Sequence, residues 1–213
     1  MKGLNTFTLK MIAIVSMLID HVGYVFFPKV TMLRIIGRLA FPIFTYALAE
    51  GFFYTRDAKK YLMRLGVFAL LSEIPYDLAV TGKVLEFSHQ NVFFTLFLGV
   101  MMLYIMSKAK NIIVQYSVVI ATVFLCKFLH TDYRNIGVLL VFIFYVFRQR
   151  KAEKLLLVGL IFLGLTGGLQ LYALLALPLI ALHNGEQGPK MKAFFYLFYP
   201  AHLLILYLVH LIV

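Results

Sequence analysis

Long apolar segments occupy almost the whole of this 213-residue chain and leave only short gaps between them. A helix that crosses a hydrocarbon core of about 30 Å needs about 20 predominantly apolar residues. Nine segments approach that requirement: 9–27, 31–53, 60–80, 91–107, 111–129, 134–149, 153–167, 169–183 and 193–213. The sequence therefore predicts an all-α, polytopic integral membrane helix bundle with eight or nine transmembrane helices, as a single domain over 1–213. Only Gly167 and Gly168 divide the seventh segment from the eighth, so 153–183 either crosses twice or forms a re-entrant hairpin.

The composition excludes several classes of protein. Hydrophobic residues make up 62% of the chain and charged residues 14%, whereas soluble domains are about 45–50% apolar and about 25% charged. A soluble fold of this length would not hide so much apolar surface. The single Cys126 excludes a disulfide scaffold and gives redox chemistry no support. A soluble enzyme and a disordered chain are excluded on the same grounds.

The basic residues alternate with the predicted connections. Fourteen of the 20 Lys and Arg residues fall at the N-terminus and in the even-numbered connections, five fall in the odd-numbered ones, and Arg38 lies within a span. The fourteen are Lys2, Lys10, Arg56, Lys59, Lys60, Arg64, Lys108, Lys110, Arg148, Arg150, Lys151, Lys154, Lys190 and Lys192. Because basic residues concentrate on the cytoplasmic side of membrane proteins, the N-terminus is predicted to be cytoplasmic. The same reading explains the net charge of +11 without a nucleic-acid partner.

Several ionisable residues lie within the predicted spans, where they are costly and indicate function by default. They are Asp20, His21, Arg34, Arg38, Glu50, Arg64, Glu73, Asp77, His202 and His210. For some of these residues a purely structural role stands beside the functional one. Arg38 either contacts a substrate or forms a buried ion pair with Asp20 or Glu73. His21 either moves a proton or only joins helices by a hydrogen bond, and His202 is either packing or part of a site.

Helical spacing aligns Lys10 with His21. Eleven residues at 100° each amount to about three full turns, so both side chains share one face and lie about 16 Å apart along the axis. Four prolines within the predicted spans, Pro42, Pro75, Pro178 and Pro200, each remove a backbone hydrogen bond. Such breaks at membrane depth predict an internal cavity. No phosphate-binding loop, HExxH motif or CxxC pair occurs, and no metal site is predicted.

The sequence resembles the TraX family. The similar motifs are Leu9-Lys10, Asp20-His21-Val22-Gly23, Leu33-Arg34-Ile35-Ile36-Gly37-Arg38-Leu39-Ala40-Phe41-Pro42-Ile43-Phe44, Glu50-Gly51-Phe52-Phe53, Ser72-Glu73-Ile74-Pro75-Tyr76-Asp77, Gln90-Asn91-Val92-Phe93-Phe94-Thr95 and Tyr196-Leu197-Phe198-Tyr199-Pro200-Ala201-His202. The founding activity of that family is N-terminal acetylation of a conjugative pilin subunit in the bacterial inner membrane. The family is similar to a larger membrane acyltransferase superfamily, whose first helix carries a basic residue and, after ten residues, an essential His. Lys10 and His21 match that spacing, while Lys60 and Arg64 only approximate the Arg-x-x-Arg motif of the superfamily.

The resemblance implies a multi-pass enzyme of the bacterial inner membrane, surrounded by lipid. It implies acetyl-CoA, or another acyl-CoA, as the donor. Phosphate groups of the donor would bind a cytosolic cluster. This cluster consists of Lys10, Arg56, Lys59, Lys60 and Arg64.

The resemblance also implies roles within the membrane. His21 would act as general base, Asp20 or Glu73 would orient its imidazole, and Arg38 or Asn91 would stabilise the developing oxyanion. A covalent acyl-histidine route stays open beside the general-base route. The acceptor would reach the site from the outer face as a peptide N-terminus, a glycan or a small molecule.

Two other functions fit part of the pattern. A proton-coupled transporter would explain the intramembrane carboxylates and broken helices, and a membrane assembly factor would hold only buried ion pairs. The sequence leaves open the acceptor, the acyl length and the oligomeric state.

Overall fold

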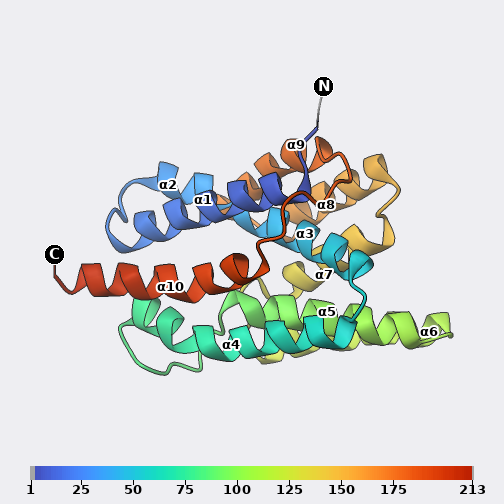
Figure 1. Cartoon of the computed structure of the whole chain (residues 1–213), viewed down its shortest axis with the longest axis horizontal. Coiled ribbons are helices and arrows are strands. Elements are labelled where there is room, and N and C mark those ends of the chain that lie inside the picture. Colours follow the sequence, from blue (N-terminus) through green and yellow to red (C-terminus); the bar gives the residue numbers. More distant parts are fainter. Residues whose placement is uncertain (1–2, 213) are drawn as a thin grey trace.

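The computed structural model describes residues 3–212 of the chain and contains helices but no named strand in that range (Figure 1). The helices are α1 (Thr6–Val25), α2 (Thr31–Gly37), α3 (Ala40–Tyr54), α4 (Ala58–Thr81), α5 (Val92–Lys108), α6 (Ile112–Phe128), α7 (Arg134–Val146), α8 (Lys151–Leu165), the 3-10 helix η1 (Gly168–Leu175), α9 (Ala176–Ala181) and α10 (Lys192–His210). The all-α class is therefore confirmed. Lys2, one of the fourteen basic residues predicted on the inner side, lies outside the described residues.

Short polar side chains fix where several helices begin. Asn5 accepts a hydrogen bond from the amide of Thr8 at 2.8 Å, and Asn111 accepts one from Ile113 at 2.8 Å. Asp57 and Asn91 cap α4 and α5 in the same way. These caps satisfy amides that a helix leaves free in its first turn. The connections therefore contain the residues that cap the first turns of these four helices.

Three helical stretches are long and apolar enough to cross a membrane: Thr6–Val25, Thr31–Tyr54 and Lys192–His210. Other apolar helices are shorter, so the expected eight or nine spans stay a prediction. Large apolar side chains cover the outside of the bundle, including Ile113 (69% exposed) and Phe128 (78% exposed). Exposed apolar surface of this extent marks contact with lipid or with other proteins, and the protein is membrane-associated.

The basic residues gather at one end of the bundle. Figure 1 shows the α3–α4, α5–α6 and α7–α8 connections at that end, opposite the α1–α2 and α4–α5 connections and the C-terminus. Helices that run back and forth place every second connection at the same end. The alternation in the sequence thus corresponds to a separation of charge along the long axis of the molecule.

The predicted helix over 31–53 is divided in the structure. α2 ends at Gly37 and α3 begins at Ala40, with Arg38 and Leu39 in a turn. Gly37 packs directly against the carboxylate of Asp20, and a Cβ at Gly37 would overlap that carboxylate. Pro42 has no amide to donate to the Arg38 carbonyl, which accounts for the break, and the turn lets Arg38 reach Asp20.

The segment 153–183 forms a hairpin. α8 is followed at Gly168 by η1 and then by the short α9, both of which pack against α8. A 3-10 helix rises about 2.0 Å per residue instead of about 1.5 Å. The second arm of the hairpin, predicted as a helix over 169–183, consists of η1 and α9 in the structure. It is about as long as α8, although η1 and α9 together have one residue fewer. Its topology in a membrane stays open.

The core surrounds α3, which packs against α1, α5, α7 and α9. α4 and α10 lie side by side, and α10 also packs against α1. This arrangement brings the first and last long helices together and leaves space between them and α4.

Replacing Gly37 with Ala should destabilise the protein, because the new Cβ meets Asp20 in a place that cannot relax without moving α1. Overpacking of this kind costs about 1–3 kcal/mol, so the thermal midpoint in detergent should fall by about 2–10 °C. Gly164→Ala in α8 is the matched control, since no atom lies within 4 Å of a Cβ built there. Equal midpoints for the two variants would contradict the packing described.

Candidate functional site

A cavity of about 720 Å³ opens between α1, α3, α4, α5 and α10. The residues that line it are Lys10, Met17, Phe44, Ala47, Leu48, Gly51, Tyr54, Thr55, Arg56, Asp57, Lys60, Tyr61, Arg64, Leu65, Val92, Phe93, Leu96, Gln187, Gly188, Pro189, Lys190, Met191, Lys192, Phe195, Tyr196 and Tyr199. Cavities of this size are typical of small-molecule sites. It lies toward the end of the bundle where the basic connections gather.

The mouth of the cavity is strongly basic. Six of its lining residues are Lys or Arg, and one is acidic. Four of the predicted donor-binding residues, Lys10, Arg56, Lys60 and Arg64, belong to this lining, whereas the fifth, Lys59, does not. The structure thus brings most of the predicted cluster together around one opening.

Two further cations at the mouth, Lys190 and Lys192, were not among the predicted site residues. The alternation of basic connections already placed them on the same side as Lys60. They are more than 120 residues away along the chain, so only the packing of α10 against α4 shows that they share a cavity.

Arg64 and Lys10 lie against aromatic rings at the mouth. The Lys10 Nζ atom is 4.9 Å from the centre of the Phe195 ring, and the Arg64 guanidinium is 5.8 Å from that of Tyr61. The Nε atom of Arg64 is buried and has no hydrogen-bond partner among the described residues. A cation held in this way retains donors for an anionic ligand.

The segment 182–191 closes one side of the cavity and is fastened to the start of the chain. The Leu4 amide donates to the Leu182 carbonyl at 2.8 Å, and the Asn184 amide donates to the Leu4 carbonyl at 2.9 Å. Gly188 has a positive φ of 67° and lies against the side chain of Asn5, where a larger residue would not fit. This pairing holds the segment that contains Lys190 in place.

The inner part of the cavity is apolar and ends near His21. Met17 lines it one helical turn before His21, and Tyr199 lines it from α10. His21 is not itself a lining residue. The centre of its ring lies 6.3 Å from that of Tyr199.

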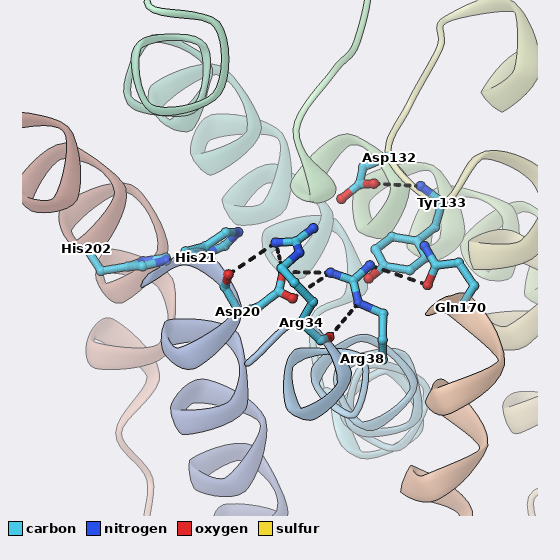
Figure 2. Close-up of polar contacts among 8 residues, drawn as sticks. All are labelled: Asp20, His21, Arg34, Arg38, Asp132, Tyr133, Gln170 and His202. Carbon is cyan, nitrogen blue, oxygen red and sulfur yellow. Dashed lines mark hydrogen bonds and ion pairs between the residues drawn. The ribbon is translucent and has the colours of Figure 1, made fainter. Parts of the chain in front are cut away.

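His21 is hydrogen-bonded to another histidine. Its Nδ1 atom lies 2.7 Å from Nε2 of His202, and Nδ1 of His202 lies 2.7 Å from the carbonyl oxygen of Phe198 (Figure 2). Sequence reasoning left His202 open between packing and site. The structure shows that it is the partner of the imidazole.

Asp20 does not orient His21, contrary to the role expected for it. Figure 2 shows its carboxylate turned toward two arginines. Nη2 of Arg38 lies 2.7 Å from each carboxylate oxygen, and Nη1 of Arg34 lies 3.0 Å from one of them. Both guanidinium groups are largely buried. Of the alternatives predicted for Arg38, the structure shows the buried ion pair, and its partner is Asp20 rather than Glu73.

Glu73 and Asn91 form a separate contact between α4 and α5. The Asn91 amide group donates to the Glu73 carboxylate and, at 2.8 Å, to the carbonyl of Ala69. Neither side chain is hydrogen-bonded to His21. The predicted catalytic residues thus form three groups: the histidine pair, the Asp20 ion pairs and the Glu73–Asn91 contact.

Asp132 lies beside the Asp20 group, in the connection between α6 and α7. Its carboxylate accepts a hydrogen bond from the Tyr133 amide at 3.0 Å. Burial raises the pKa of Asp132 to about 6, although the nearby Arg38 opposes that shift. This carboxyl group was not among the predicted site residues.

Among residues 3–212, no group of three or more His, Cys, Asp or Glu side chains is arranged to hold a metal ion.

The fold and the cavity together define a helical, membrane-associated protein with a large cavity that is basic at its mouth and apolar inside. The chain belongs to the TraX family, because the family model described as "TraX protein" matches residues 6–210. It is 29% identical to a probable fimbrial assembly protein FimC, serogroup H1, of Dichelobacter nodosus, over 95% of this chain and 94% of that protein. It is also 31% identical to the uncharacterized protein RP591 of Rickettsia prowazekii, over 43% of this chain and 33% of that protein. No solved structure is significantly similar.

The raised pKa of Asp132 predicts a pH-dependent stability. Between about pH 4 and pH 6 the folded protein holds a proton on Asp132 that the unfolded chain has released, so stability falls as the pH rises through this window and stays lower above it. Asp132→Asn removes this loss and keeps an acceptor for the Tyr133 amide. The thermal midpoint of the variant relative to the wild type should therefore be higher at pH 7.5 than at pH 4. A difference that is constant with pH would contradict the assignment.

Proposed function

We propose that this protein is a membrane-bound acyltransferase. It moves an acetyl or short acyl group from cytosolic acyl-CoA to an amine or hydroxyl at the outer face of the bacterial inner membrane. The observation that carries the proposal is the cavity with a basic mouth that ends one helical turn before His21. Membership of the TraX family, which is associated with pilin acetylation, supports the same chemistry.

The cavity suits the shape of the donor. Acyl-CoA has a nucleotide with several phosphate charges at one end and an uncharged arm that ends in the thioester. In the proposal the phosphates bind Lys60, Arg64, Lys190 and their neighbours at the mouth, where charge-assisted hydrogen bonds are strong. The arm runs along the apolar wall toward His21, about 16 Å beyond Lys10 along α1.

The chemistry needs one base. Nε2 of His21 takes the proton of the acceptor while the acceptor's nitrogen or oxygen attacks the thioester carbonyl. The carbon–sulfur bond then breaks, and the thiolate that leaves takes the proton from the imidazolium. In the alternative route, His21 attacks the thioester first and passes the acyl group on as an acyl-histidine.

The proposal places the N-terminus and the basic end of the bundle in the cytosol, with several further helices crossing the membrane. The acceptor enters from the opposite end. The relative from Dichelobacter nodosus is described as a fimbrial assembly protein, which favours a pilin-like peptide N-terminus over a glycan or a small molecule.

The transporter alternative rests on four intramembrane carboxylates, and two of them are held in ion pairs. Asp20 is paired with Arg34 and Arg38, and Glu50 lies 2.9 Å from Arg148. Glu73 and Asp77 accept hydrogen bonds from amide groups and are not ion-paired within the described residues, so a transporter would have to carry protons on these two. The basic cavity next to His21 favours the acyltransferase proposal.

Acetyl-CoA should bind the purified protein, and the double variant Lys60→Ala/Arg64→Ala should bind it at least tenfold more weakly. Each lost hydrogen bond to a charged group costs about 1.5–3 kcal/mol. Isothermal titration calorimetry in detergent measures the affinity. Lys59→Ala is the control, because Lys59 belongs to the same helical turn but does not line the cavity. Absence of acetyl-CoA binding by the wild type would overturn the proposed function.

His21→Ala should abolish acetyl transfer and leave the affinity for acetyl-CoA nearly unchanged, because the base is lost while the mouth is intact. Transfer of labelled acetyl from acetyl-CoA to a model peptide, measured with the purified protein in detergent, where both faces are accessible, gives the rate. His89→Ala, an exposed histidine in the α4–α5 connection, is the control. Normal transfer by the His21 variant would remove this residue from the mechanism.

A further inference from the structure

The histidine pair joins two helices that are far apart in the sequence. His21 lies in α1 and His202 in α10, and their rings are 4.9 Å apart between centres and tilted by 31° (Figure 2). His202 is buried, with 5% of its surface exposed. It is stacked on Phe198, at 4.9 Å between ring centres and 17° between planes. Its ring is therefore held on one side by packing and on the other by His21.

The hydrogen bonds fix which nitrogen of each ring carries a proton. The carbonyl oxygen of Phe198 only accepts, so Nδ1 of His202 is the donor in that 2.7 Å contact. A neutral His202 then has a lone pair on Nε2. The 2.7 Å contact between the rings consequently needs a proton on Nδ1 of His21.

Charged and aromatic groups surround the pair. Arg34 of α2 and Arg38 of the following turn are bound to Asp20, the neighbour of His21 in α1. Tyr199 of α10 faces both rings, with its centre 6.3 Å from that of His21 and 5.7 Å from that of His202. Among the described residues, His202 is the one side chain hydrogen-bonded to the His21 ring.

We infer that His202 is a positioning residue that holds His21 in the tautomer with a free lone pair on Nε2. The chain of donors runs from His21 Nδ1 to His202 Nε2 and from His202 Nδ1 to the Phe198 carbonyl. It leaves Nε2 of His21 as the atom that accepts the proton of the acceptor. The inference rests on the proposed function, in which His21 is the base, and it assigns to His202 the role that sequence reasoning gave to a carboxylate.

The tautomer itself is the first test, because it does not depend on activity. In protein labelled with ¹⁵N-histidine, the His21 resonances, assigned by loss in His21→Ala, should show a protonated Nδ1 and an unprotonated Nε2. The opposite tautomer would overturn the inference. This spectrum is recorded on the wild type, so it does not depend on whether the His202 variants fold.

Two variants of His202 separate positioning from packing. His202→Phe keeps a ring that stacks on Phe198 but offers no acceptor, and kcat for acetyl transfer should fall by about 10- to 100-fold. His202→Gln carries an amide oxygen that reaches the position of Nε2 and should restore kcat to within about threefold of the wild type. The affinity for acetyl-CoA should be unchanged in both.

The outcomes distinguish the inference from the function on which it rests. Equal kcat values for the wild type and His202→Phe would overturn the positioning role while leaving acyl transfer intact. A wild type that binds no acetyl-CoA and transfers no acetyl group would overturn the proposed function, and the ¹⁵N spectrum would still decide the tautomer.

Discussion

The ion pairs of Asp20 with Arg34 and Arg38 are the interaction on which the arrangement of the first three helices depends. A charged group in a region of low dielectric constant is costly unless it is paired. Asp20 has 7% of its surface exposed, and its carboxylate is held by both guanidinium groups. Loss of one partner from a buried pair of this kind costs about 3–5 kcal/mol. Both arginines must therefore stay within reach of Asp20, which holds α2 against α1.

This requirement has two effects on the site. It brings Gly37, at the end of α2, into contact with the Asp20 carboxylate. It also keeps the Asp20 carboxylate away from the imidazole of His21, although the two residues are adjacent in the sequence. The imidazole is hydrogen-bonded to His202 in α10 instead. A carboxylate beside a histidine in the chain suggests an orienting pair, yet the stronger attraction of two cations decides the geometry here.

Much of the fold was predictable from the sequence, because apolar length and the alternation of basic residues are local or additive properties. Apolar length predicts the all-α class and the position of most helices. The alternation of basic residues predicts that Lys60 and Arg64 lie at the same end of the bundle as Lys10. Pro42 marks the division at Arg38, but the choice of Asp20 over Glu73 as the partner of Arg38 was not predictable, since it depends on how closely α1 and α2 approach. Continuous helix across Pro75 and Pro200 likewise shows that a proline signals a lost hydrogen bond but does not fix where a helix ends.

Several parts of the site that sequence reasoning missed come from the last part of the chain. Lys190 and Lys192 carry no local motif, and the TraX-like motif that ends in His202 does not link it to residues in the first third of the protein. Their roles arise from the packing of α10 against α1 and α4, which joins positions more than 120 residues apart. Helix spacing relates residues within one helix only, so it identified Lys10 and His21 but not their partners.

The attachment of segment 182–191 to residues 4–7 has a consequence for biosynthesis. The first helix leaves the ribosome long before the segment that borders the cavity on its other side, and the backbone bonds between Leu4 and Leu182 form only after both exist. The basic mouth and the histidine pair are therefore both completed by the final helix. A chain that stops before α10 contains His21 and five of the six basic residues of the mouth but lacks Lys192 and His202, so the lining of the cavity and the histidine pair are completed together, late in the assembly of the protein.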